Sequence, residues 1–322
     1  MNYTDLLIVG AGPIGISCAL AAQKAGLSYR VIEKGCLTNS LFNYPLDMQF
    51  FSSSEKLELE QIPFVSTSVK PSRTEALEYY RRVTNAHKLN IQLYERVNQI
   101  TPAGTDFEII TDHNTYRAKS VVLATGFFDL PETLGVPGES LSKVTHYFNQ
   151  AHPYSLQKVA VVGASNSAID AALACYRKGA EVTLVVRGPE IGKRVKYWVR
   201  PDIINRIEEG SIKAHFNTQI KTIHPTSIEL IQGDRTWQED NDFVIAMTGY
   251  RPDLDFLSNL GIPLEGVTKK PVHDSETMMT PIKGLYLAGV ICGGLETHKW
   301  FIENSRTHGK KIVTHILENN QA

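Results

Sequence analysis

The residues best suited to chemistry in this sequence are three glycines whose spacing is typical of a pyrophosphate-binding turn. Gly10, Gly12 and Gly15 follow a short apolar run and open a segment with helical character. In a βαβ unit, the first glycine permits a tight turn and the second lets the backbone approach a pyrophosphate. The third lets the helix pack closely on the strand, and the helix N-terminus faces the negative charge. Residues 5–34 are therefore predicted to form a dinucleotide-binding unit.

A second turn of this kind follows the apolar run at residues 159–162. Gly163, Ser165 and Ala168 take the three positions, with serine in place of the middle glycine. Each turn has its own strand before it, a helix after it and a second strand at the expected distance, which a chance cluster of glycines would lack. The chain is therefore predicted to bind two dinucleotides and to pass electrons between them.

The second strands of the two units end in side chains of opposite charge. Glu33 ends the first, where a carboxylate accepts hydrogen bonds from a ribose with free hydroxyl groups. Arg187 ends the second, and Lys193, Arg194 and Lys196 follow it. A guanidinium pairs with a 2′-phosphate that a carboxylate would repel. The first unit thus suits FAD or NAD and the second NADPH, unless the basic run is only a solvated loop.

Redox chemistry by a paired-cysteine motif is excluded. The four cysteines are Cys18, Cys36, Cys175 and Cys292, and none of them lie in a Cys-x-x-Cys spacing. No cysteine–histidine cluster has the spacing of a zinc site, so no metal is expected. The weak catalytic candidates are Cys292, which follows the turn at Gly289, Cys18, one helical turn beyond position 14, and His146 as a proton donor.

The remaining pattern indicates how these residues are positioned. Residues 35–72 read as a long functional loop, 73–89 as an amphipathic helix and 91–118 as an antiparallel insert. Apolar strands are expected at 120–126, 242–252 and 283–289, followed by a helix starting near Thr297. The fold class is therefore α/β with two Rossmann-like domains. Residues 1–118 and 247–322 are predicted to form the FAD domain, into which an NADPH domain, 119–246, is inserted.

Composition limits the partners. The 322 residues include 33 basic and 34 acidic side chains, which gives a net charge of −1 and argues against a nucleic-acid partner. No run of 18 apolar residues is present, so no membrane span is expected. Residues 1–10 run into the first strand without a leader pattern, and the expected location is the cytoplasm.

With these motifs in place, the chain resembles low-molecular-weight thioredoxin reductases, and more closely the bacillithiol disulfide reductase family. The matching segments are spread over nearly the whole length; they are Asn43–Pro45, Phe50–Ser54, His146–Phe148, Ala151–Tyr154, Asn166–Ala172, Gly249–Asp253 and Phe301–Asn304. The resemblance implies a homo-oligomer with FAD in the first domain and NADPH in the second.

Three departures bear on the chemistry. The stretch from Lys143 to Ala151 lacks the cysteine pair of thioredoxin reductases. Gly289–Val290 replaces the usual Gly-Asp pair, a change that the bacillithiol disulfide reductases share. Ile14 stands where members of that family carry a cysteine in the first glycine turn. The third departure leaves the disulfide-reducing step without its expected thiol.

Together, motifs and resemblance predict two sets of cofactor-binding residues. The FAD set is Gly10, Gly12, Pro13, Ile14, Gly15, Glu33, Lys34, Asn43, Phe51, Val97, Ala124, Thr125, Gly126, Gly289 and Val290. The NADPH set is Gly163, Ser165, Asn166, Ser167, Ala168, Arg187, Lys193, Arg194 and Gly249.

The predicted activity is an FAD-dependent oxidoreductase that takes hydride from NADPH and reduces a low-molecular-weight disulfide such as bacillithiol disulfide. A reductase for ferredoxin, flavodoxin, a quinone or oxygen is the main alternative, because Ile14 replaces the cysteine. A flavin monooxygenase is disfavoured, since its Phe-x-Gly-x-x-x-His motif is missing before His146. A nucleotide sensor that binds both dinucleotides without turnover would carry the same motifs.

Overall fold

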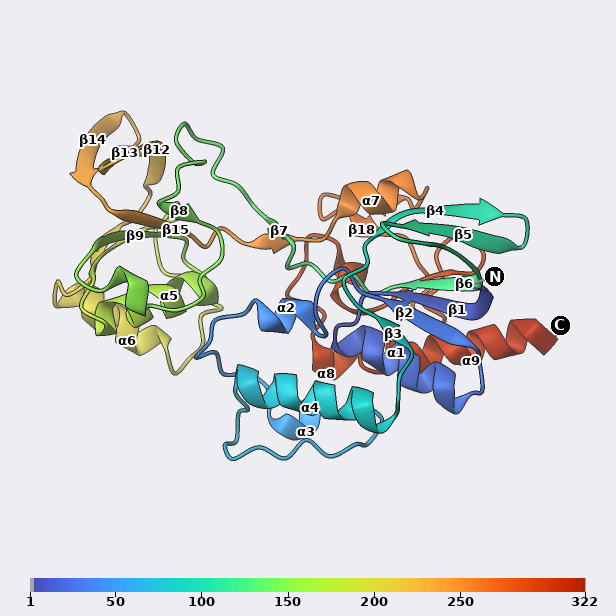
Figure 1. The fold of residues 1–322 in the computed structure, drawn as a ribbon. Helices are drawn as coiled ribbons and strands as arrows, with labels where there is room; N and C mark the ends of the chain where they lie inside the picture. Colours follow the sequence, from blue (N-terminus) through green and yellow to red (C-terminus); the bar gives the residue numbers. More distant parts are fainter. Residues whose placement is uncertain (1–2, 322) are drawn as a thin grey trace. The chain divides into compact units, whose positions relative to one another are not determined.

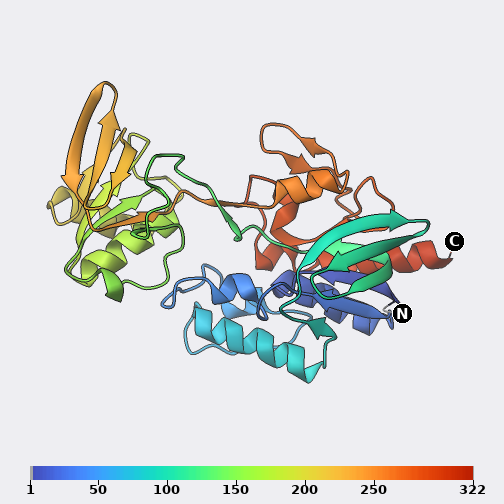
Figure 2. The same ribbon diagram turned by 45° about the horizontal axis from the view of Figure 1, so that its top comes forward.

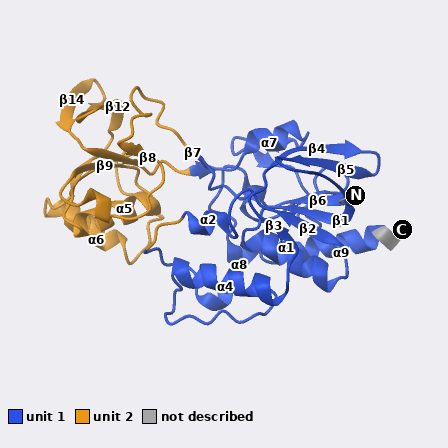
Figure 3. Ribbon diagram, in the orientation of Figure 1, with its two compact units in different colours: residues 1–43, 47–130, 250–322 blue, residues 44–46, 131–249 orange. Residues whose placement is uncertain are grey.

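The computed structural model describes residues 3–321, which divide into two compact units (Figure 3). Unit 1 comprises residues 1–43, 47–130 and 250–322, and unit 2 comprises residues 44–46 and 131–249. The discontinuous order matches the predicted insertion. The predicted first boundary, 118/119, was misplaced, because it falls inside strand β6 (Thr115–Leu123), which pairs along its length with β1 (Tyr3–Val9). The second boundary moves from 246/247 to 249/250.

Unit 1 is built on a mixed sheet with the order β3-β2-β1-β6-β5-β4, and β19 also pairs with β6. The strands not yet bounded are β2 (Tyr29–Ile32), β3 (Ile91–Gln92), β4 (Val97–Ala103), β5 (Asp106–Thr111) and β19 (Leu285–Leu287). β1, β2, β3, β6 and β19 pair in parallel, whereas β4, β5 and β6 form an antiparallel meander. The predicted antiparallel insert is therefore confirmed for β4–β6 but not for β3.

Helices cover one face of this sheet, with α1 (Pro13–Lys24) beside α9 (His308–Gln321) (Figures 1 and 2). The predicted helix at 73–89 is α4 (Arg73–Ala86), which begins with a capping box between Ser72 and Glu75. The long segment before it holds only α2 (Asn39–Phe42) and α3 (Ser54–Leu57).

The C-terminal part of unit 1 begins with α7 (Leu254–Asn259) and the short pair β17 (Leu264–Glu265) and β18 (Lys270–Pro271). After β19 the chain forms the 3-10 turn η2 (Gly289–Gly293), α8 (Ile302–Ser305) and α9. The predicted helix start near Thr297 was wrong. The chain turns there instead, and α8 starts where the Phe301 N–H donates to the Asn304 side chain at 2.7 Å.

Unit 2 contains a five-stranded parallel sheet with the order β11-β10-β9-β15-β8. Its strands are β8 (Val144–Thr145), β9 (Lys158–Val162), β10 (Glu181–Val185), β11 (Lys213–His215) and β15 (Phe243–Ala246). On one face lie α5 (Asn166–Arg177) and α6 (Arg200–Glu208), and η1 (His152–Tyr154) precedes β9.

A second, antiparallel sheet covers the other face of unit 2 (Figure 1). It consists of β12 (Gln219–His224), β13 (Ser227–Gln232) and β14 (Arg235–Asp240). Strand β9 shows why both layers are needed: Val159 and Val161 pack under α5, whereas Ala160 and Val162 pack under β12 and β13. A strand with apolar residues on both faces is stable only when both faces are covered.

The chain crosses between the units at β7 (Leu130–Pro131) and β16 (Tyr250–Arg251), which pair as a two-stranded ribbon. Between residues 3 and 321, no helix has both the length and the apolar character that crossing a membrane requires.

Candidate dinucleotide-binding sites

The first glycine turn has the backbone geometry that a pyrophosphate site requires. Gly10 has a φ of +107°, and a Cβ there would lie 2.6 Å from the Ala124 carbonyl oxygen at the end of β6. A Cβ on Gly15 would collide with the Gly10 carbonyl. At Gly12, by contrast, no described atom would come within 4 Å of a Cβ, so space is open at the N-terminus of α1. The two outer glycines close the turn, and the middle one leaves room for an anion.

Glu33 closes the same turn from the end of β2. Its carboxylate accepts hydrogen bonds from the Ala11 N–H at 2.8 Å and the Gly35 N–H at 2.9 Å, and the residue is only 6% exposed. Burial raises the pKa of this carboxyl group, and the two backbone hydrogen bonds oppose the shift. The neighbouring Lys34 is held by an ion pair with Asp129. Each carboxylate oxygen keeps a lone pair with which it can accept from a ribose hydroxyl.

Gly289 lies directly against the first turn. A Cβ on Gly289 would lie 3.3–3.5 Å from three side-chain atoms of Ile14. On its other side, the Gly289 N–H donates to Nδ1 of the buried His308 at 3.1 Å. Burial lowers the pKa of His308 to about 4, so the ring is neutral near pH 7 and accepts this hydrogen bond. Val290 follows in η2 and is half-buried.

The other predicted FAD residues occupy different parts of unit 1. Thr125 and Gly126 follow Ala124 at the end of β6, beside the turn. Asn43 is exposed at the end of α2, Phe51 is exposed in the following loop, and Val97 begins β4. The structure brings the residues of the first turn together with Ala124 and Gly289.

The two cysteines near this turn are completely buried. Cys18 lies where α1 meets α9: a Cβ on Gly309 would lie 2.8 Å from the Cys18 Cα. Cys292 lies in η2 and is also 0% exposed. Burial raises the pKa of Cys18 to about 12. Burial also raises the pKa of Cys292, and the neighbouring Cys18 contributes to that shift. Because the thiolate is the reactive form, these environments disfavour redox activity at both residues.

The remaining cysteines are no better placed. Cys36 is half-buried, and both burial and the charge of Glu33 raise its pKa. Cys175 is a residue of α5 and lies in the core of unit 2, where burial raises its pKa to about 12. The predicted proton donor His146 contacts a carboxylate within unit 2, with 3.2 Å between its Nε2 and Glu139 Oε1.

The second glycine turn repeats the geometry of the first. Gly163 has a φ of +130°, and a Cβ there would lie 2.6 Å from the carbonyl oxygen of Met247, just after β15. Ala168 is fully buried in α5, and its Cβ would be 3.0 Å from a Cβ on Gly163. Ser165 is the N-cap residue of α5, and Gly249 has a φ of +112° after β15.

The basic residues after β10 divide into two groups. Arg187, Lys193 and Arg194 are exposed, and the Lys193 side chain is 85% exposed. Lys196, in contrast, forms an ion pair with Asp170 on α5 at 2.7 Å, and only 10% of its side chain is exposed. The prediction that Lys196 faces a 2′-phosphate with the others is therefore corrected: its ammonium group holds the loop to α5.

Two positions in these sites were missed from the sequence. His308 carried no signal, because its partner Gly289 is 19 residues away and joined to it only by the fold. Gly192 packs so closely that a Cβ there would lie 2.8 Å from the Ala164 carbonyl oxygen. For Gly192, the available sequence signal was the presence of a glycine within the basic run.

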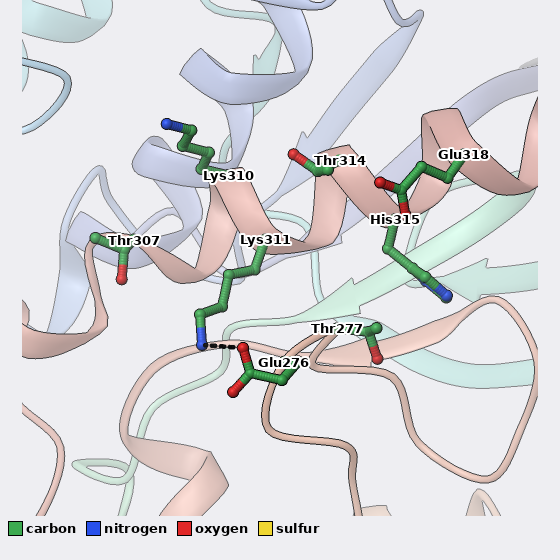
Figure 4. A pocket seen from close by; sticks show the side chains of 8 residues that line it. All are labelled: Glu276, Thr277, Thr307, Lys310, Lys311, Thr314, His315 and Glu318. Carbon is green, nitrogen blue, oxygen red and sulfur yellow. Dashed lines mark ion pairs between the residues drawn. The ribbon is translucent and has the colours of Figure 1, made fainter.

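A pocket elsewhere on unit 1 lies between α9 and the turn before β19 (Figure 4). Lys311 and Glu276 face each other across it, with 3.9 Å between Nζ and Oε2. The lining residues are Glu276, Thr277, Thr307, Lys310, Lys311, Thr314, His315 and Glu318. This pocket contains no residue of either glycine turn. Among the described residues, no group of three or more His, Cys, Asp or Glu side chains could hold a metal ion.

Comparison with known proteins agrees with this geometry. The family model described as pyridine nucleotide-disulphide oxidoreductase matches residues 7–289, which span both glycine turns. The chain belongs to this family. It is therefore an oxidoreductase with the two-domain fold predicted from the sequence, and the family uses a flavin and a pyridine nucleotide.

Full-length relatives narrow the similarity. The chain is 39% identical over 320 residues to bacilliredoxin reductase Bdr of Bacillus subtilis, and the match covers 99% of each chain. Two solved structures of bacillithiol disulfide reductase Bdr are also similar, each with a TM-score of 0.97. The one from Bacillus cereus is 38% identical and covers 98% of this chain and 99% of its own. The one from Staphylococcus aureus is 36% identical and covers 100% of both.

A more distant relative is the ferredoxin–NADP reductase of Thermus thermophilus. It is 27% identical over 318 residues, which cover 90% of this chain and 85% of that protein. The full-length matches to the three Bdr chains, and not this one, confirm the resemblance to the bacillithiol disulfide reductase group.

Proposed function

We propose that this protein is an NADPH-dependent flavoprotein that binds FAD on unit 1, binds NADPH on unit 2 and reduces a low-molecular-weight disulfide such as bacillithiol disulfide. The observation that carries the acceptor is the full-length similarity to the Bdr chains, whose names specify bacillithiol disulfide or bacilliredoxin. The contrast between Glu33 and Arg187 supports the assignment of the two dinucleotides.

The residues present in unit 1 fit FAD. Gly12 leaves space for a pyrophosphate at the start of α1, and Glu33 is oriented by two backbone N–H groups toward a ribose. Ile14 and Gly289 would form an apolar edge beside the turn. When bound, FAD supplies hydride and electron transfer, while the protein orients the reacting groups and excludes water.

The residues of unit 2 fit NADPH. Ser165 and α5 offer a helix N-terminus to a pyrophosphate, and Arg187, Lys193 and Arg194 offer exposed cations to a 2′-phosphate. The predicted homo-oligomeric state and cytoplasmic location remain predictions.

The decisive experiment is anaerobic. The purified protein should be yellow and release FAD on denaturation, and NADPH should bleach its flavin absorbance. Bacillithiol disulfide should then restore the absorbance. A protein that neither carries nor takes up FAD would refute the cofactor assignment. A protein that bleaches with NADPH but passes no electrons to the disulfide would refute the acceptor alone.

A reductase for ferredoxin or flavodoxin is the second candidate, because the ferredoxin–NADP reductase match covers most of the chain and Ile14 offers no thiol. The same assay separates the two, with ferredoxin, flavodoxin, a quinone and oxygen as competing acceptors. Reoxidation by ferredoxin at a rate well above that with the disulfide would favour this candidate.

A further inference from the structure

The loop at residues 191–196 is fixed to the second glycine turn at several points. The Gly192 N–H donates to the Ala164 carbonyl at 3.0 Å, an approach that any Cβ at position 192 would hinder. Ile191 and Val195 are both buried in the core of unit 2. The loop is therefore packed against unit 2 and is not a freely solvated basic run.

Asn166 makes two further hydrogen bonds to the 191–196 loop. Its Nδ2 donates to the Arg194 carbonyl at 3.2 Å, and its Oδ1 accepts from the Lys196 N–H at 2.9 Å. The side-chain amide thus pairs with the two peptide groups that flank Val195, as a neighbouring strand would. One helical turn further along α5, Asp170 holds the Lys196 ammonium group at 2.7 Å.

These contacts determine which basic groups remain for a ligand. Lys196 is paired with Asp170 and largely covered, whereas the side chains of Lys193 and Arg194 are exposed on the fixed loop. Lys193 also has an exposed carboxylate nearby, with 3.7 Å between its Nζ and Glu190 Oε1. A phosphate site gains affinity when its cations are held in place before the ligand arrives, because less side-chain and loop entropy is then lost on binding.

We infer that Asn166 is a positioning residue for 2′-phosphate recognition: its side chain fixes the 192–196 loop, so that Lys193 and Arg194 are held ready to discriminate NADPH from NADH. This inference rests on the proposed assignment of NADPH to unit 2. The backbone of Asn166 still lies at the N-terminus of α5, whereas its side chain acts through the loop.

The test measures binding of adenosine fragments, so it needs no turnover. The dissociation constants of 2′,5′-ADP and 5′-AMP are measured by titration calorimetry for the oxidised holoprotein and for Asn166→Ala. The variant should bind 2′,5′-ADP about tenfold more weakly, the effect of about one charge-assisted hydrogen bond, and 5′-AMP as before. In steady-state assays, the ratio of kcat/KM for NADPH to kcat/KM for NADH should fall about tenfold, chiefly because KM for NADPH rises.

Gly192→Ala provides an independent perturbation, since its Cβ would push the same loop away from Ala164. It should show the same selective loss. Gln232→Ala is the matched control, because the Gln232 amide donates to the Phe216 carbonyl at 2.8 Å elsewhere in unit 2. Its fragment affinities should equal those of the parent, and thermal melting of all variants monitors folding.

The outcomes separate two failures. If Asn166→Ala weakens both fragments equally, or changes neither, the positioning role is refuted while the NADPH assignment stands. If the parent itself binds 2′,5′-ADP no more tightly than 5′-AMP, the NADPH assignment is refuted, and this inference with it.

Discussion

The two glycine turns close in the same way but are held by different side chains. In each, the first glycine approaches the carbonyl at the end of a neighbouring strand, and a Cβ would lie 2.6 Å from the oxygen of Ala124 in one turn and of Met247 in the other. The first turn is fixed by the side chain of the buried Glu33, whereas the second is joined to the 191–196 loop by the Gly192 N–H and the Asn166 side chain.

This difference shows which part of a dinucleotide each feature serves. The pyrophosphate is common to both cofactors, so the backbone geometry of the turn is common too. The adenosine ends differ, and so do the residues after the second strand. A buried carboxylate suits free ribose hydroxyls, and exposed cations on a fixed loop suit a 2′-phosphate.

The largest effect is expected from substitutions at the third position of each turn. Gly15→Ala should destabilise the protein by about 3 kcal/mol or more and abolish FAD retention, because its Cβ would collide with the Gly10 carbonyl. Ala168→Gly should cost only about 1 kcal/mol, the usual helix penalty of glycine, and preserve NADPH binding. Urea unfolding measures the stability of both variants, and flavin content measures their FAD retention. A Gly15→Ala protein with parental stability and flavin content would contradict the comparison.

Lowering the pH should reduce the stability of unit 1, because His308 beside the first turn is held neutral in the folded protein. Its pKa is lowered from 6.5 to about 4, so the unfolded chain takes up the proton first as the pH falls. The contribution of His308 to stability is therefore complete above pH 6.5 and is lost on acidification to pH 4. At 1.36 kcal/mol per pH unit, the loss is about 3 kcal/mol.

His308→Asn keeps an acceptor for the Gly289 N–H but does not titrate in this range. The difference in unfolding free energy between parent and variant should shrink by about 3 kcal/mol between pH 7 and pH 4, as measured by urea unfolding. His87→Asn, at the exposed end of α4, is the control and should follow the parent. Parallel pH profiles for the parent and His308→Asn would refute a native-state role of the neutral ring.

At the second turn, Arg187→Ala should weaken NADPH by about ten- to 150-fold and leave NADH nearly unchanged, since a charge-assisted hydrogen bond contributes about 1.5–3 kcal/mol. Binding titrations with both cofactors measure the ratio. Arg235→Ala, an exposed arginine on β14, is the matched control. Equal losses for both cofactors would show that Arg187 does not contact the 2′-phosphate.

The smallest effect is expected at the cysteines beside the first turn. Cys18→Ser and Cys292→Ser should each cost about 1 kcal/mol of stability, because a hydroxyl replaces a buried thiol. Flavin bleaching by NADPH and reduction of the disulfide should stay at the parental rate. Cys175→Ser in unit 2 serves as a control. Loss of disulfide reduction in Cys292→Ser alone, with bleaching intact, would identify that thiol as redox-active.

Local patterns in the sequence were sufficient for the fold and for the turns. Gly10, Gly15 and Gly163 were identifiable because the space at each position leaves no room for a side chain. Each position therefore requires glycine, and this requirement is visible in the sequence itself. The α/β class followed from apolar runs joined to helical segments. The apolar runs at 120–126 and 242–252, which bracket the second unit, indicated the inserted order of the domains, although the structure places the first boundary after β6, at residue 130.

Tertiary structure alone decided what the polar and sulfur-containing side chains do. Lys196 and Arg194 look alike in the sequence, yet Asp170 binds the first and leaves the second exposed. Cys18 is covered by Gly309, 291 positions away, and Gly289 is paired with His308. A glycine turn is dictated by the conformational limits of its own residues. Burial, pKa and pairing depend on neighbours that are brought together only when the chain folds.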